Sequence, residues 1–218
     1  MLRQLTSRQI AWLIYVVLAF VWGSSFILIM RGLDVFSAWE VGAIRLVIAG
    51  LVMVPMVIHR IQEVPKEKWK YIFSIGILGN ALPAVLFPLA ETQINSASAG
   101  VLNSLSSVFT LVLGMLFFGL QFTRFRILGV FIGLIGAAAL ILGGNESLDA
   151  HQHVPYALLA VVATIGYGLS TNIIKKHLQD VPTLLASGFA LMFVAIPYLL
   201  YLPFTDVISD ISTKPEGW

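Results

Sequence analysis

The sequence predicts an all-α fold, a polytopic membrane helix bundle with seven transmembrane helices. Of its 218 residues, 58% are hydrophobic and 11% are charged, whereas soluble domains have about 25% charged residues. The mean hydropathy is +0.91, so the chain lacks the polar surface that a folded protein needs in water. Seven apolar runs have about the 20-residue length that crosses a bilayer: 10–30, 37–58, 71–90, 95–118, 127–143, 154–174 and 183–204.

The first three runs have the features of membrane helices joined by short connections. Run 10–30 is too long for the apolar core of a signal peptide, and no small-residue cleavage site follows it. Run 37–58 follows after a short loop, so the two helices are expected to be antiparallel. Pro83 and Pro88 in run 71–90 each remove a backbone donor, so this helix is expected to bend.

The fourth run, 95–118, is the most polar of the seven. Its small and polar residues recur at spacings of three and four and therefore share one helix face: Ser96, Gly100, Asn103, Ser107 and Thr110. An unpaired polar group in lipid costs several kcal/mol, so this face is expected to look towards other helices or a water-filled cavity. The fifth run, 127–143, carries glycines spaced for a close helix crossing.

The distribution of Lys and Arg predicts a cytoplasmic N-terminus. With this orientation the inner segments hold ten basic residues: Arg3, Arg8, Arg60, Lys66, Lys68, Lys70, Arg124, Arg126, Lys175 and Lys176. The outer segments hold two, Arg31 and Lys214. Because cytoplasmic loops carry the excess of positive charge, we expect a multi-pass protein of the cell (inner) membrane.

The last two runs repeat features of the first two. A shift of the sequence by 145 residues aligns residues 22–25 (WGSS) with residues 167–170 (YGLS). The same shift pairs further positions of the second and seventh runs: Leu46 with Leu191, and Gly50 with Ala195. The loop between the two helices keeps its length, which strengthens the interpretation as a repeat.

A repeat of five helices enters the membrane upside down in its second copy, because five is an odd number. We therefore expect residues 1–143 to form the first five-helix repeat. Residues 154–218 are then an incomplete second repeat that supplies two helices, seven of an expected ten, so that the chain is truncated at its C-terminal side. In transporters built from inverted repeats, the substrate site lies at the repeat interface near the bilayer midplane.

Several short motifs occur together along the chain. They are residues 20–26 (FVWGSSF), Arg45 inside the second run, residues 96–100 (SASAG), residues 118–123 (FGLQFT) and the glycine-rich stretch 129–139. Together they resemble EamA-type transporters of the drug/metabolite transporter superfamily. The resemblance implies a ten-helix fold of two inverted five-helix repeats that moves small metabolites by alternating access.

Six residues are candidates for lining a substrate pathway: Trp22, Ser25, Asn103, Ser107, Tyr167 and Thr171. Trp22 lies about 18 Å along its helix at 1.5 Å per residue, which is too deep for an aromatic belt at the membrane surface. Helix packing is the alternative interpretation for Trp22 and for the hydroxyl residues. For Asn103, the four hydrogen-bonding positions of its amide favour contact with a substrate.

Two charged residues are candidates for a role at membrane depth. Arg45 lies about 12 Å inside its helix, where insertion of an Arg costs about 2.5–3.5 kcal/mol. We expect a structural ion pair with Glu40 or Glu91, in preference to recognition of an anionic substrate. Glu91 ends the third run, where it either takes part in coupling, by binding a proton or an organic cation, or marks the water boundary.

The sequence predicts a secondary transporter that exports small metabolites or drugs, and not an enzyme. No nucleotide-binding loop is present. The alternatives are a seven-helix receptor and a membrane-embedded enzyme. A retinal receptor needs a Lys in its last helix, which run 183–204 lacks, and an enzyme should cluster His, Asp or Glu at membrane depth. We expect no cofactor, metal site or nucleic-acid partner; the expected partners are a small-molecule substrate, protons and the lipid bilayer.

Overall fold

A computed structural model of the chain describes residues 6–119, 123–143, 150–207 and 209, and the regular structure in these ranges is helical. The principal helices are α1 (Ser7–Leu33), α2 (Ala38–Val57), α3 (Trp69–Gly76), α4 (Leu82–Glu91), α5 (Ser96–Asn103), α6 (Leu105–Phe118), α7 (Arg124–Gly143), α8 (Ala150–His177) and α9 (Thr183–Tyr201). Short turns complete them: η1 (Ile58–Glu63), η2 (Lys66–Lys68), the π-helical turn η3 (Ile77–Ala81) and η4 (Leu202–Phe204).

Six helical stretches of the described chain are long and apolar enough to cross a membrane: Arg8–Leu33, Ala38–Glu63, Lys66–Glu91, Ser96–Phe118, His153–His177 and Thr183–Phe204. They coincide with six of the seven expected runs. The remaining run, 127–143, lies within α7. The predicted all-α, polytopic membrane bundle is therefore confirmed.

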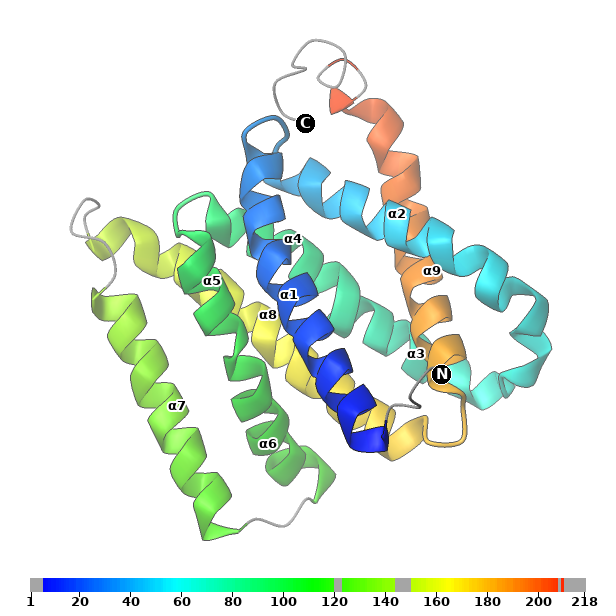
Figure 1. Cartoon of the computed structure of the whole chain (residues 1–218). Helices are drawn as coiled ribbons and strands as arrows, with labels where there is room; N and C mark the ends of the chain where they lie inside the picture. The colour runs from blue at the N-terminus through cyan, green and yellow to red at the C-terminus, as the bar shows by residue number, and fades with distance from the viewer. Residues whose placement is uncertain (1–5, 120–122, 144–149, 208, 210–218) are drawn as a thin grey trace, which may run out of the picture.

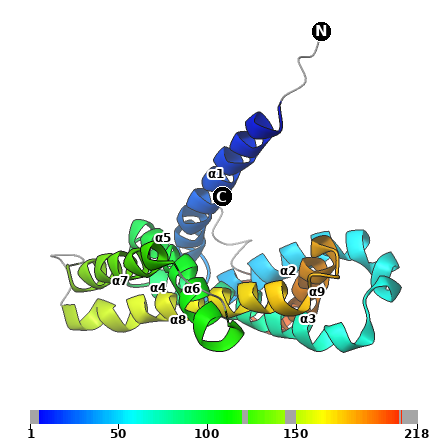
Figure 2. The ribbon, with the colours of Figure 1, turned by 90° about the horizontal axis from the view of Figure 1, so that it is seen from below.

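The helices form a layer from which α1 projects. Figure 2 shows α1 rising out of this layer, while Figure 1 shows α7 at one edge and α2 with α9 at the other. Only the C-terminal part of α1 packs closely, because Ile29 is buried in a cluster with Phe87 and Leu102. The chain then turns at Asp34 and enters α2 through a capping box, in which Glu40 accepts hydrogen bonds from the Ser37 backbone at 2.8 Å and hydroxyl at 2.7 Å.

The third expected helix is irregular in the turn that precedes its first proline, Pro83. Pro83 has no N–H for the carbonyl one turn earlier, and the preceding turn widens into the π-helical η3, in which the Leu82 N–H bonds to Ile77 O. The side chain of Asn80 donates to Ile75 O at 3.3 Å. Such π turns are frequent at functional sites.

The fourth expected helix is interrupted by a turn at Ser104, between α5 and α6, while Ser96–Phe118 still forms one stretch long enough to span a membrane, as predicted for run 95–118. The Ser104 backbone N–H and hydroxyl both bond to Val101 O, at 3.0 Å and 2.6 Å. The Ser107 N–H then bonds to Ser104 O at 3.2 Å. Each of these bonds joins a residue to the carbonyl three positions earlier, which tightens the helix locally. The Ser104 hydroxyl contributes because it competes for a backbone carbonyl.

Helices α2 and α9 pack against each other in antiparallel directions. Gly188 near the start of α9 lies against Val57 at the end of α2, whereas Gly50 lies against Ala195 and Leu191 further along α9. A Cβ atom on Gly50 would overlap the side chain of Ala195, so this close approach requires glycine.

Lys68 joins two loops at one end of the bundle. Its Nζ donates to His177 O, at the end of α8, at 2.8 Å, and to Asp180 Oδ1 at 2.7 Å. The hydrogen bond from Lys68 lowers the pKa of the Asp180 carboxyl. The cation also lies at the carbonyl end of a long helix, where positive charge is favourable.

Helices α6 and α8 are held together by a buried amide. Asn172 is 2% exposed, and its Nδ2 donates to Thr110 O of α6 and to Gly168 O of its own helix, both at 2.8 Å. A Cβ atom on Gly168 would lie 2.8 Å from the backbone of Phe109. The two helices can therefore approach closely only with glycine at this position.

Replacing Asn172 with Leu should lower the free energy of unfolding by about 1–2 kcal/mol, because the bond to Thr110 O is lost. Unfolding in mixed detergent micelles measures this difference. Asn103→Leu is the matched control, since the Asn103 side chain makes no hydrogen bond among the described residues. Equal stability of the two variants would contradict the role of Asn172.

Candidate functional site

A cavity of about 720 Å³ lies among α1, α2, η3, α4, α5, α6 and α8. We call it the central cavity. All six residues proposed to line a pathway contribute to its wall, and so does Arg45: Trp22, Ser25, Arg45, Asn103, Ser107, Tyr167 and Thr171. Their common location is a finding of the structure, and their role in transport stays a prediction.

Arg45 projects from α2 into the central cavity, and its Nη2 donates to Ser25 Oγ of α1 at 3.3 Å. The expected ion pair is not formed. Glu40 instead caps the start of α2. Within the described ranges the ion pairs are Arg31–Asp34, Arg60–Glu63 and Lys68–Asp180. The prediction of a structural ion pair for Arg45 is therefore wrong.

Glu91 lies at the end of α4 and is only 2% exposed. The Ser96 hydroxyl lies 3.1 Å from Glu91 Oε2 and 3.2 Å from Phe26 O, so it donates to one of them at a time. The other carboxylate oxygen, Oε1, has no hydrogen-bond partner in the part of the chain that the structure describes. Glu91 still lies near enough to Arg45 to attract its charge.

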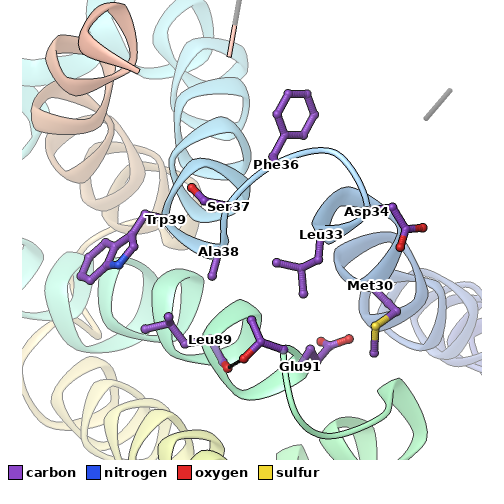
Figure 3. A pocket seen from close by; sticks show the side chains of 10 residues that line it. Met30, Leu33, Asp34, Phe36, Ser37, Ala38, Trp39, Leu89 and Glu91 are labelled. Atoms are coloured by element: carbon purple, nitrogen blue, oxygen red, sulfur yellow. Dashed lines mark hydrogen bonds between the residues drawn. The ribbon is translucent and has the colours of Figure 1, made fainter. Parts of the chain in front are cut away.

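Glu91 belongs to a second cavity, of about 570 Å³, which we call the mouth cavity. Figure 3 shows its wall: Met30 and Leu33 from the end of α1, the loop that carries Asp34, and Leu89 with Glu91 from the end of α4. Arg45 and Glu91 were both predicted from the sequence as charged residues with a role at membrane depth. The structure separates them, one in each cavity.

Polar side chains of α5, α6, α8 and the turn at Ser104 include some that bond to a backbone carbonyl and some that do not. The hydroxyls of Ser104 and Thr110 donate to carbonyls of their own helices, at 2.6 Å and 2.7 Å. The side chains of Asn103, Ser107 and Thr171 make no hydrogen bond among the described residues and line the central cavity. Ser107 is exposed and Asn103 and Thr171 are half-buried, so their polar atoms are free to bind water or a solute.

Aromatic rings line another part of the central cavity. Phe26 and Phe87 meet edge to face with their centroids 5.4 Å apart, and Phe87 stacks on Tyr167 at 6.2 Å. Trp22 also lies in this wall and is 62% exposed. The cavity therefore combines one cation, neutral polar groups and an aromatic surface.

Several lining residues were not predicted from the sequence, among them Asn80, Phe87 and Ser106. Asn80 had a usable signal, because it is an amide inside an apolar run. Ser106 lies three residues after Asn103, a spacing that also fits one helix face. Phe87 carried no signal, since a phenylalanine in a membrane helix is equally suited to lipid.

A bundle of apolar helices around a cavity with both polar and aromatic side chains is an architecture that membrane transporters have. The model of the EamA-like transporter family matches residues 9–142, more than half of the chain. The protein belongs to the EamA-like transporter family.

The chain is similar to several curated proteins. It is 24% identical over 195 residues to an "Uncharacterized transporter" of Archaeoglobus fulgidus, covering 88% of this chain and 67% of that protein. It is 25% identical over 182 residues to the "Uncharacterized inner membrane transporter YedA" of Escherichia coli K12, covering 81% of this chain and 58% of YedA. The chain thus spans about three fifths to two thirds of the length of these relatives.

A third similarity is more local. The "Thiamine-repressible mitochondrial transport protein THI74" of Saccharomyces cerevisiae is 28% identical over 120 residues, which are 53% of this chain and 32% of that protein. No solved structure matches the chain. The names of the relatives agree with the family in describing membrane transport.

Proposed function

We propose that this protein is a secondary transporter that exports small metabolites or drugs by alternating access, with the central cavity as the substrate pathway. The observation that carries the proposal is the set of free polar side chains, from Asn103, Ser107 and Thr171, that meet in one cavity. Such groups are expensive in lipid, and transport of a polar solute gives them partners. The family supports transport as the general activity.

The proposed mechanism uses two inverted repeats, residues 1–143 and the partial repeat 154–218. Two contacts support it. Gly50 lies against Ala195 and Leu191, while Leu46 and Leu191 share one core cluster. These are the positions that the 145-residue shift pairs. Two residues that a two-fold axis relates can contact each other only where they lie beside that axis. We therefore place the axis that relates the two repeats between α2 and α9. Rocking of one repeat against the other then opens the cavity to alternate sides.

We propose that the protein resides in the cell (inner) membrane with its N-terminus in the cytoplasm. The excess of Lys and Arg in alternate loops supports this orientation. It places Lys68 and Asp180 on the same side, in agreement with their 2.7 Å contact. The printed name of the Escherichia coli relative, an inner membrane transporter, supports the location.

Glu91 is the proposed site of proton coupling. A carboxylate that is 2% exposed, with one oxygen lacking a donor, is stabilised by taking up a proton, because a buried charge without partners is costly. Its position in the mouth cavity gives it a path to water.

Asn103→Leu should reduce flux by about tenfold or more, because the central cavity loses an amide that binds the solute, at 1–2 kcal/mol per hydrogen bond. Flux of labelled amino acids, organic acids and organic amines through membrane vesicles that contain the full chain measures the effect. Val101→Leu, on an exposed part of the same helix, is the matched control. Equal flux in both variants would refute the cavity as the pathway.

Glu91→Gln should make transport insensitive to the proton gradient, because the neutral amide cannot exchange a proton. The measurement is flux before and after an uncoupler collapses the gradient, in wild-type and variant vesicles. Asp34→Asn serves as control, since Asp34 lines the same mouth cavity but is exposed and lies 3.9 Å from Arg31. If the uncoupler slows the Gln variant as much as the wild type, the proton is coupled elsewhere.

A further inference from the structure

We propose that the central cavity binds a small organic anion, with a carboxylate or similar oxoanion held by Arg45 beside Ser25 and an apolar body lying along Phe26 and Phe87. The inference rests on the proposed function for the location of the site. It adds the chemical class of the substrate.

The first argument is the state of the Arg45 side chain. An arginine keeps its charge at any physiological pH and has five N–H donors in a planar fork. In this structure one donor makes a 3.3 Å bond to a neutral serine, and no carboxylate of the described residues forms an ion pair with the guanidinium. The Arg45 residue is exposed on the cavity side of the bundle, so its remaining donors are accessible to a solute, and a bound oxoanion satisfies them through paired hydrogen bonds.

The second argument is the sign of the charge around the central cavity. Arg45 is the only residue of its described wall that carries a formal charge; the other lining side chains are neutral. Glu91 attracts Arg45 from the mouth cavity, but its carboxylate is buried against Ser96 and does not line the central cavity. The charge that faces a solute is therefore positive, which favours an anion and disfavours an amine.

The third argument is the shape and chemistry of the rest of the wall. The rings of Phe26, Phe87 and Tyr167 form a continuous row, with centroids 5.4 Å and 6.2 Å apart. The volume of about 720 Å³ lies within the 300–1,000 Å³ typical of small-molecule sites. An anion with an apolar or aromatic body uses both the guanidinium and this row. The free amide of Asn103 is available to a second polar group of the same solute.

Three probes with one carbon skeleton test the inference: 3-phenylpropionate, 3-phenylpropionamide and 3-phenylpropylammonium. Their binding to the purified full chain in lipid nanodiscs is measured by calorimetry at physiological salt. We expect the carboxylate to bind at least about tenfold tighter than the amide, the factor that a charge-assisted hydrogen bond provides, and the ammonium to bind weakest. Equal or reversed ranking, or no binding of any probe, would overturn the proposal.

Variants of Arg45 and Ser25 provide a second test, which does not depend on the ranking of the three probe affinities. Arg45→Gln should lower the affinity for the carboxylate to that for the amide and leave the affinity for the amide unchanged, while Arg45→Lys should restore part of the difference. Val101→Leu should behave as wild type. If Arg45→Gln does not fold, Ser25→Ala replaces it, because this variant removes only the small contact between Ser25 and Arg45. Ser25→Ala should lower the affinity for the carboxylate probe alone. An unchanged affinity for the carboxylate would contradict the site.

The outcomes also separate this inference from the proposed transport. Saturable flux of amines or neutral solutes, together with unchanged affinities in Arg45→Gln, would refute the anion site and leave the pathway intact. Conversely, the expected ranking without flux of any of the three probes would support the anion site and count against transport through this cavity.

Discussion

Every polar group inside the hydrocarbon core of a bilayer must find its partner in protein or in enclosed water, and the arrangement of this chain follows from that requirement. The helices satisfy their own backbones, and several hydroxyls bond back to a carbonyl about one turn away, as those of Thr110 and Thr164 do. Asn172 uses its amide to join α8 to α6. Other polar side chains, those of Asn103, Ser107 and Thr171, have no hydrogen bond among the described residues and lie with Arg45 around one cavity. A polar solute or water in this cavity would supply the partners that these side chains lack.

Close helix packing determines where that cavity lies. Gly168 allows the backbone of α8 to reach that of α6, and Gly50 allows α2 to reach α9. These contacts hold α6, α8 and α2 together, while α1 rises out of the layer (Figure 2) and Trp22, past its midpoint, is 62% exposed. One wall of the central cavity is therefore made by a helix with few contacts.

Much of the fold was predictable, because length and hydropathy alone determine whether a segment spans a bilayer. The spacing of Asn103 and Ser107 likewise predicted a common polar face, and the structure places both residues in one cavity. The partner of Arg45 was not predictable. Glu40 and Ser37 have the spacing of a capping box, and Glu40 forms this local interaction instead of an ion pair with Arg45 of the same helix. The break at Ser104 was also missed, because a serine in a membrane helix usually bonds back to its own turn without ending the helix.

The central claim is that water reaches polar side chains inside a bundle whose outer surface faces lipid. Because the chain has no cysteine, single cysteines can be introduced and labelled without background. The decisive measurement is the rate at which a water-soluble thiol reagent labels Ser107→Cys and Thr171→Cys in membranes, compared with Ile48→Cys, which is 59% exposed on α2 and lies outside the central cavity. We predict rapid labelling of the first two and slow labelling of the third. Labelling of Ile48→Cys as fast as the others, or none at Ser107 and Thr171, would contradict a water-filled pathway.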